Sequence, residues 1–291
     1  MSTPSIALER RPAEERKGSA QVSRIFLYVL LALFAIFFLV PVYVAIVTAL
    51  KTTQEVATSG IWAPTGNPTL NNFTRAFDVL GKGFGNSLIL SIPAVAISAL
   101  LGSMNGYVLS KWKFRGSNLL FTFMLFGMFI PYQSVLIPLV QFLQTLNLYA
   151  SIPGLIIVHV IYGIPITTLI FRNYYAGVPN ELIESGTVDG AGFFGIYRHI
   201  VFPISLPAFV VVLIWQFTAV WNEFLFAVTL NSNPATQPVT VALAGLGSSQ
   251  AGIDYGLQMA GSLITALPTL LVYIVLGRFF IRGLLAGSVK G

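Results

Sequence analysis

The chain has 291 residues, of which 55% are hydrophobic and only 9% are charged, and its formal net charge is +6. Soluble domains carry about 25% charged residues, so this composition predicts an all-α integral membrane protein and lies outside the range of soluble domains. The sequence contains no cysteine, which excludes disulfides, thiolate metal sites and cysteine nucleophiles.

The N-terminal segment differs in composition from everything that follows. Residues 1–23 are rich in Arg, Glu, Ser, Ala and Pro and show no periodic apolar face, which predicts a disordered cytoplasmic tail. The remainder, 24–291, is predicted to form a single transmembrane domain of six helices. Six apolar stretches are each long enough to cross roughly 30 Å of hydrocarbon. They lie at about 25–50, 86–110, 118–140, 152–171, 203–228 and 259–281.

Lysine and arginine residues collect at the ends of these spans, on alternate sides. If the N-terminus is cytoplasmic, thirteen of them lie inside and only Lys51, Arg75 and Lys82 lie outside. The positive-inside rule therefore predicts that both termini are cytoplasmic, and that the polar loop between the fourth and fifth spans, at about 178–202, is cytoplasmic as well. The same distribution explains the positive net charge without nucleic acid as a partner.

This polar loop combines acidic residues, glycines and ordered apolar residues. Pro179 fixes its own φ, and Asn180 is a favourable cap for the turn that follows. Glu181 and Glu184 place negative charge at the positive N-terminal end of a helix dipole. We therefore predict a short helix at about 181–188.

A turn and a second helix are predicted after it. Gly190, which follows Asp189, suits a backbone that must turn through positive φ. Gly192 leaves the next segment free to start a helix that runs to Ile200 and stops before Pro203. The result is a helix–turn–helix on the cytoplasmic face of the membrane.

The first of these helices carries apolar residues that a polar loop would not need for its own stability. Leu182, Ile183 and Val188 are suited to a helix that lies in the groove of a partner protein. The alternative is an amphipathic helix that lies on the lipid surface. Such a helix would favour Lys and Arg on its polar face, whereas this one is acidic.

The order of residues in the loop resembles that of a known family. The spacing of Glu184, Asp189, Gly190 and Pro203 is similar to the EAA loop in the membrane subunits of binding-protein-dependent ABC importers. The flanking sequence resembles the carbohydrate branch of that family, of the maltose-permease (MalG-like) type. The stretches that carry the resemblance are PNELIE at 179–184, VDGA at 188–191, IVFP at 200–203, PTLNNF at 68–73, WNEFLFA at 221–227 and GSVKG at 287–291.

The resemblance implies a permease subunit of an ATP-driven sugar importer in a bacterial cytoplasmic (inner) membrane. Its implied partners are a second, related permease in a heterodimer, two cytoplasmic ATPases, an extracytoplasmic solute-binding protein and membrane lipid. ATP and Mg²⁺ would bind to the ATPase, so this chain would hold no cofactor and perform no catalysis. The implied ATPase-coupling residues are Glu181, Leu182, Glu184, Gly186, Asp189, Gly190 and Ala191. One departure is that Ser185 and Gly186 stand where the family usually has two alanines.

The fifth span contains the strongest candidates for a substrate pathway. A carboxylate such as Glu223 costs roughly 2.5 to 3.5 kcal/mol at the bilayer centre and less near an interface. Gln216 and Glu223 are seven residues apart and share a helical face, beside a stripe of Trp215, Thr218 and Asn222. Gln216, Thr218, Asn222 and Glu223 are therefore predicted to line a possible sugar pathway. Packing or interfacial anchoring is the alternative for the aromatic residues of this span.

Other polar and small residues inside the spans suggest packing. His159 is the lone histidine within a span, and a hydrogen bond inside the helix bundle is favoured over a proton relay. Ser98, Gly102 and Gly106 form a small-residue stripe that lets another helix approach closely. Prolines inside the spans predict kinks. They are Pro93, Pro131, Pro138, Pro165 and Pro268.

Three other classes of function remain as alternatives to a sugar permease. An ABC permease for a non-sugar solute would share the loop. An ion-coupled secondary transporter would show inverted repeats and several intramembrane ionisable residues, and the sequence offers mainly Glu223 and His159. A membrane enzyme would need a catalytic motif, and no Walker A, GxSxG or HExxH pattern is present.

Overall fold

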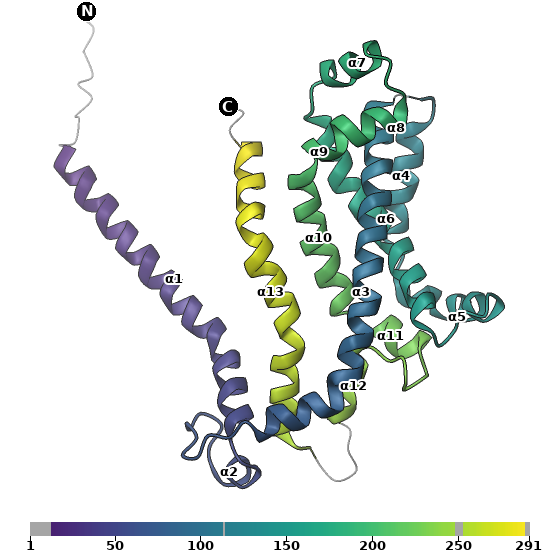
Figure 1. Cartoon of the computed structure of the whole chain (residues 1–291). Coiled ribbons are helices and arrows are strands. Elements are labelled where there is room, and N and C mark those ends of the chain that lie inside the picture. The colour runs from purple at the N-terminus through teal and green to yellow at the C-terminus, as the bar shows by residue number, and fades with distance from the viewer. Residues whose placement is uncertain (1–12, 113, 248–252, 289–291) are drawn as a thin grey trace, which may run out of the picture.

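The computed structural model describes residues 13–112, 114–247 and 253–288, and all regular structure in these ranges is helical (Figure 1). The helices, in chain order, are α1 (Ala13–Leu50), α2 (Thr53–Thr58), α3 (Asn71–Lys111), α4 (Ser117–Gly127), η1 (Tyr132–Val135), α5 (Leu136–Thr145), α6 (Ile152–Ala176), α7 (Glu181–Val188), α8 (Phe193–Ile196), η2 (Tyr197–Val201), α9 (Phe202–Ile204), α10 (Leu206–Trp221), α11 (Leu225–Leu230), α12 (Val239–Leu246) and α13 (Tyr255–Ser288). The start of α1, the end of α13 and the short helix α7 lie at the same end of the molecule (Figure 1).

Four of the described helices are long and apolar enough to cross a membrane on their own. They are α1 over Ser23–Leu50, α3, α6, and α13 over Tyr255–Phe279. Two further apolar segments are bent: α4 meets η1 and α5 at 88°, and the α8–α9 segment meets α10 at 76°. The described residues therefore provide four straight spans, or up to six if each bent pair crosses as one span.

The bends correct the prediction of continuous helices at 118–140 and 203–228. In the first, α4 ends at Gly127, and Pro131 then precedes the short η1 turn. In the second, Pro203 and Pro207 stand in the first turns of α9 and α10. A proline has no N–H to donate and its ring crowds the preceding turn, so the chain ends one helix and starts another at each place.

Several helix ends also differ from the prediction. Residues 13–23, expected to be part of a disordered tail, are helical in α1, while 1–12 lie outside the described residues. Helix α3 begins at Asn71, well before the predicted start at 86, and its first part runs across one end of the molecule before the helix turns (Figure 1). Hydropathy windows detect only the part of a helix that is apolar enough to lie in lipid.

The centre of the molecule is the contact between α3 and α6, where the backbones approach closely. A Cβ atom on Gly102 would lie 2.1 Å from Thr167 Oγ1, and one on Gly106 would lie 2.8 Å from the backbone nitrogen of Arg172. No side chain fits at these distances. The prediction of a small-residue packing stripe is therefore confirmed, and α6 is the helix that approaches it.

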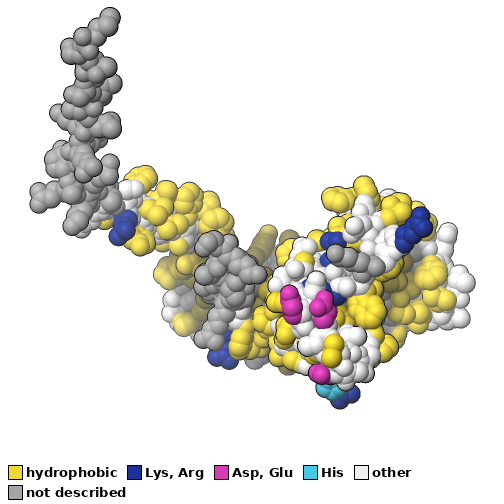
Figure 2. All heavy atoms as spheres, turned by 90° about the horizontal axis from the view of Figure 1, so that it is seen from above, with side chains coloured by type: hydrophobic (Ala, Val, Ile, Leu, Met, Phe, Trp, Pro, Cys, Tyr) yellow, Lys and Arg dark blue, Asp and Glu magenta, His cyan; other side chains and the backbone are white. Residues whose placement is uncertain are grey.

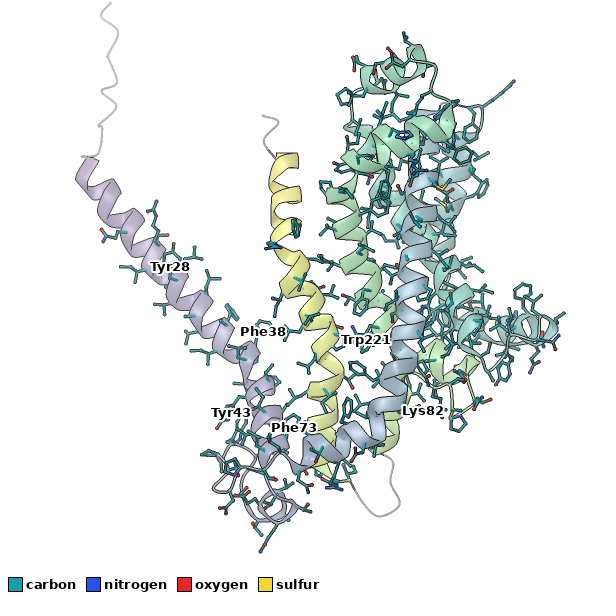
Figure 3. The ribbon with its side chains drawn as sticks, in the orientation of Figure 1. Tyr28, Phe38, Tyr43, Phe73, Lys82 and Trp221 are labelled. Atoms are coloured by element: carbon teal, nitrogen blue, oxygen red, sulfur yellow. The ribbon has the colours of Figure 1, made fainter. Side chains whose placement is uncertain are left out.

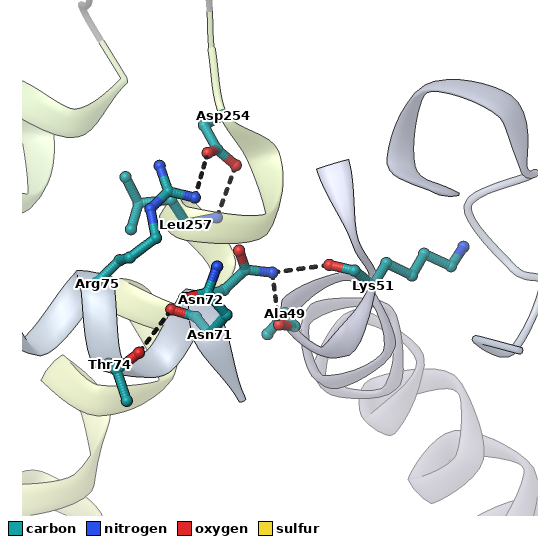
Figure 4. Close-up of polar contacts among 8 residues, drawn as sticks. All are labelled: Ala49, Lys51, Asn71, Asn72, Thr74, Arg75, Asp254 and Leu257. Atoms are coloured by element: carbon teal, nitrogen blue, oxygen red, sulfur yellow. Dashed lines mark hydrogen bonds and ion pairs between the residues drawn. The ribbon is translucent and has the colours of Figure 1, made fainter. Parts of the chain in front are cut away.

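At the end of the molecule away from α7, polar contacts join three long helices (Figure 4). The Asn72 side chain donates to the backbone oxygens of Ala49 and Lys51, at 2.9 and 2.8 Å. Arg75 forms a salt bridge of 3.0 Å with Asp254. These contacts satisfy the free carbonyls at the end of α1 and join it to the starts of α3 and α13.

Beyond the contacts with Asn72, α1 diverges from the rest of the molecule. Tyr28 and Phe38 are 68% and 72% exposed, and Figure 3 shows them along a helix that diverges from its neighbours. None of the most apolar window of the α1 span is buried inside this chain. An apolar surface of this length requires lipid or another membrane protein around it.

Candidate functional site

The short helix α7 and the turn after it follow the predicted pattern. Helix α7 spans Glu181–Val188, and Gly190 adopts a φ of +80°. The N–H of Ala191 donates to the oxygen of Gly186 at 2.9 Å, and the N–H of Gly190 donates to that of Thr187 at 3.0 Å. This pair of bonds is a Schellman motif, which ends a helix with a residue in the left-handed conformation. Glycine at position 190 therefore sets the direction in which the chain leaves α7.

The start of α7 is fixed differently from the prediction. Asn180 occupies the N-cap position, but its side chain makes no capping bond. Instead, its Oδ1 accepts a hydrogen bond of 2.9 Å from Lys111 Nζ, which also donates to the backbone oxygen of Val178. The ammonium group at the end of α3 outcompetes the local cap because a charged donor makes the stronger bond. Lys111 therefore holds the loop where it leaves α6.

The glycine that replaces an alanine of the usual family motif lies at a tight helix contact. Gly186 is buried, and a Cβ atom there would lie 2.6 Å from Ile200 Cδ1 and 3.3 Å from Ile196 Cγ1. Both are atoms of flexible side chains. The missing methyl group lets α7 pack more closely on the second helical segment than an alanine would without movement of these isoleucines.

The outward surface of the loop is acidic and apolar at once. Glu181, Glu184 and Asp189 are exposed, and none of them forms a salt bridge with the part of the chain that the structure describes. Leu182 is 42% exposed and Val188 is 87% exposed. Figure 2 looks onto this end of the molecule and shows acidic side chains beside hydrophobic ones. A surface of this kind is suited to a partner with an apolar groove and basic residues at its rim.

Two apolar residues of the loop differ from the sequence interpretation. Ile183, expected on the exposed face, is half-buried and packs against the core formed around Tyr107 and Phe171. Phe194, in α8, is 69% exposed and was not identified from the sequence. Like Val188, this exposed aromatic residue of the loop is a candidate anchor for a partner. Because Phe193 and Phe194 are consecutive, the sequence has no periodic signal that distinguishes the half-buried ring of Phe193 from the exposed ring of Phe194.

The four candidates for a substrate pathway do not lie together. Gln216 is 4% exposed and its Nε2 lies 3.5 Å from the backbone oxygen of His159, so its amide faces α6. Asn222 is exposed, and its amide donates to the Thr218 oxygen at 2.9 Å. Trp215, which is 57% exposed, lies on the same helical face as Thr218 and Asn222. On this face of α10 and its C-cap, Trp215 and Asn222 are exposed and Thr218 is half-buried.

Glu223 has hydrogen-bond donors that the sequence did not indicate. Its two carboxylate oxygens accept the backbone N–H groups of Phe226 and Ala227, at 2.8 and 3.2 Å. The carboxylate therefore caps the first turn of α11. The cap also explains why α10 ends at Trp221 and does not continue to the predicted end at 228, since a side-chain cap competes with continuation of the helix.

Two other residues of the span region are packing residues. Trp221 is 1% exposed, and its indole N–H donates to the Thr265 oxygen in α13 at 2.9 Å (Figure 3). His159 is 5% exposed, and its Nε2 has no hydrogen-bond partner in the part of the chain that the structure describes. The hydrogen bond that the sequence favoured for His159 is therefore not made by Nε2 within the described residues. The ring instead packs edge-on against Phe226.

We expect that replacing Glu223 by alanine lowers stability and that replacing it by glutamine lowers stability less. Alanine removes both acceptors of the α11 cap, whereas glutamine keeps one oxygen. Loss of a helix cap costs roughly 0.5–2 kcal/mol. The thermal unfolding midpoints of the purified variants test this order. A Glu223→Gln variant with an unchanged midpoint and no transport would show instead that the charge acts in transport.

A chain of apolar helices that exposes a short acidic and apolar helix–turn–helix at one end has the features of a membrane transport subunit. Residues 94–282 match the family described as "Binding-protein-dependent transport system inner membrane component". The match covers more than half of the chain, so the protein belongs to this family of ABC transporter permeases. It is a multi-pass membrane protein and a transport subunit.

Several relatives agree with this placement. The chain is 42% identical to the xylose/arabinose import permease protein XacI of Haloferax volcanii, over 90% of this chain and 92% of that protein. It is 43% identical to a probable ABC transporter permease protein of Pyrococcus horikoshii, over 92% of this chain and 98% of that one. A crystal structure of a bacterial ABC transporter involved in the import of alginate has the same fold, with a TM-score of 0.77 and 19% identity. That match covers 96% of this chain and all of the compared chain.

Proposed function

We propose that this protein is the membrane-spanning permease subunit of an ATP-driven sugar importer, and that the loop at 178–202 couples it to a cytoplasmic ATPase. One observation carries the proposal. The loop exposes Glu181, Glu184 and Asp189 beside Leu182 and Val188, at the same end as the start of α1 and the end of α13. A sugar substrate is supported by a relative that shares 42% identity and is named for xylose and arabinose import.

The complete importer contains more than this chain. We propose a second, related permease, two ATPases that bind ATP and Mg²⁺, and a solute-binding protein on the outer side. The uncovered length of α1 supports a further membrane subunit, since its most apolar window is not buried within this chain. Both termini and the coupling loop face the cytoplasm, as the distribution of Lys and Arg indicates, and the protein resides in the cytoplasmic membrane.

The translocation pathway is proposed to follow the exposed face of α10. Thr218 and Asn222 offer a hydroxyl and an amide, and Trp215 offers an apolar ring face, which together suit the polar edges and apolar faces of sugars. The other two candidates, Gln216 and Glu223, make contacts within the chain. Gln216 contacts α6, and Glu223 caps the helix that follows.

An uptake assay with the assembled importer in proteoliposomes tests the proposed function. Labelled xylose and arabinose are the first probes, with ATP enclosed in the lumen on the ATPase side. We expect uptake that requires ATP and persists when an ionophore removes ion gradients. Uptake that follows an ion gradient without ATP would contradict the ATP-driven mechanism. ATP-driven uptake of a non-sugar solute, without uptake of either sugar, would contradict the sugar substrate.

We expect a membrane-impermeant thiol reagent to reach the two ends of the protein from opposite sides. The natural chain has no cysteine, so Arg115→Cys and Asn67→Cys each introduce a single exposed thiol. In intact cells only Asn67→Cys should react, and Arg115→Cys should react after the membrane is opened. Labelling of Arg115→Cys in intact cells would reverse the proposed orientation.

A further inference from the structure

A chain of three hydroxyl groups, two of them on fully buried residues, connects the coupling loop to the two central helices. The hydroxyl of Tyr197, in the π-helical segment η2, donates to Ser103 Oγ at 3.0 Å. Ser103 Oγ in turn lies 2.6 Å from the hydroxyl of Tyr175. Ser103 is fully buried in α3, and Tyr175 is 1% exposed in α6. One residue from each of three segments therefore meets at a single point inside the protein.

Aromatic rings surround this chain on the side of α3. The ring of Tyr107 is fully buried and stacks on Phe193 with 5.1 Å between centroids. It also lies 5.9 Å from the ring of Tyr197 and packs edge-on against Tyr175. The second helical segment of the loop is thus seated on α3 by both packing and directional hydrogen bonds.

The same helix also holds the other end of the loop. Lys111 lies about two turns beyond Ser103 in α3, and it binds Val178 and Asn180 just before α7. Helix α3 therefore contacts the loop where it leaves α6 and again after α8. Between these two contacts, α7 packs on the loop through Gly186 and exposes Glu181, Leu182, Glu184 and Val188, which are available to a partner.

A further tyrosine meets the point where the loop turns into α10. The hydroxyl of Tyr174 donates to the backbone oxygen of Ile204 at 2.6 Å. Ile204 is the last residue of α9, directly before the 76° bend into α10. Tyr174 and Tyr175 are adjacent in α6, so this helix contacts the loop both at the hydroxyl chain and at the bend.

We propose that Tyr197, Ser103 and Tyr175 are positioning residues for energy coupling, whose hydroxyl chain makes the coupling loop move as one unit with α3 and α6. This inference rests on the proposed function of the loop. Apolar packing alone has no preferred direction and tolerates sliding, whereas hydrogen bonds between buried hydroxyls fix distance and orientation. The π-helical turn that carries Tyr197 agrees with this role, because such turns occur frequently at functional positions.

The test compares transport with ATP hydrolysis in the assembled importer. Tyr197→Phe, Tyr175→Phe and Ser103→Ala each remove one hydroxyl and keep most of the packing. We expect the ATPase to copurify with each variant as it does with the wild type. The amount of labelled arabinose taken up per ATP hydrolysed should fall about five-fold, the factor that a hydrogen bond of about 1 kcal/mol represents. Tyr132→Phe is the matched control, since the Tyr132 hydroxyl makes no hydrogen bond within the described residues.

The outcomes separate this inference from the proposed function. A wild-type complex without ATP-driven uptake would overturn the proposed function. A wild-type ratio of uptake to hydrolysis in all three variants would overturn the inference alone. Loss of the assembled complex in all three would also overturn it, because the hydroxyls would then hold the fold rather than transmit movement. A lowered ratio in Tyr132→Phe as well would show that the effect is not specific to the chain.

Discussion

Replacing Gly106 by leucine should remove almost all of the folded protein from the membrane. A Cβ atom at this position would lie 2.7 Å from Phe171 Cβ and 2.8 Å from the backbone nitrogen of Arg172. Neither atom belongs to the end of a flexible side chain, so α3 and α6 must separate before any side chain fits. Overpacking typically costs about 1–3 kcal/mol, and leucine adds a whole side chain at the central helix contact. Size-exclusion chromatography of the detergent-solubilised protein measures the loss.

A glycine elsewhere in the same helix provides the control. A Cβ atom on Gly85 meets nothing within 4 Å in this chain, so Gly85→Ala should give the wild-type elution peak and thermal midpoint. Gly106→Ala should lie between this control and Gly106→Leu. A Gly106→Leu variant with wild-type yield and midpoint would show that the close approach of α3 and α6 is not required for folding.

Replacing Gly190 by valine should abolish uptake while the protein still inserts and folds. The φ of +80° costs a non-glycine residue roughly 1–2 kcal/mol, and a β-branched residue adopts it with the greatest difficulty. The Schellman bonds to Gly186 and Thr187 would be lost, and the chain would leave α7 in another direction. Since nothing lies within 4 Å of a Cβ atom there, the effect comes from the backbone and not from a clash. Uptake of labelled arabinose in proteoliposomes, with protein amount as the reference, measures it.

Asparagine at the same position gives a matched control, since it tolerates the left-handed conformation better than other residues with a side chain. Gly190→Asn should keep most of the uptake. Glu184→Lys should resemble Gly190→Val, because it reverses a charge on the exposed face and opposes the dipole of α7. Equal uptake by Gly190→Val and Gly190→Asn would contradict the role of the turn.

Local features of the sequence predicted the parts of the structure that depend on neighbouring residues. The helix at 181–188 and the positive φ at Gly190 follow from dipole and turn preferences. The close approach of another helix to α3 follows from the spacing of Gly102 and Gly106, although the sequence did not identify that helix as α6. In each case, the residues that determine the feature lie within one or two turns of one another.

The features that the sequence did not predict depend on residues that are far apart or on side chains that bind the backbone. Nothing in the sequence pairs Ser103 with Tyr197, which is 94 residues away. The same is true of Lys111 and Asn180, whose contact replaces the predicted cap. The cap that Glu223 forms is a further case, because composition cannot show that its carboxylate binds the N–H groups of α11.

Purification of the tagged chain from membranes that contain the whole transport system tests the central claim most directly. The wild-type chain should retain an ATPase subunit through the acidic and apolar face of α7. Val188→Asp and Glu184→Lys, which alter only exposed side chains of that face, should lose the ATPase and keep the other membrane subunit. An ATPase retained equally by the wild type and both variants, or absent from the wild type, would contradict the assignment of this loop as the coupling site.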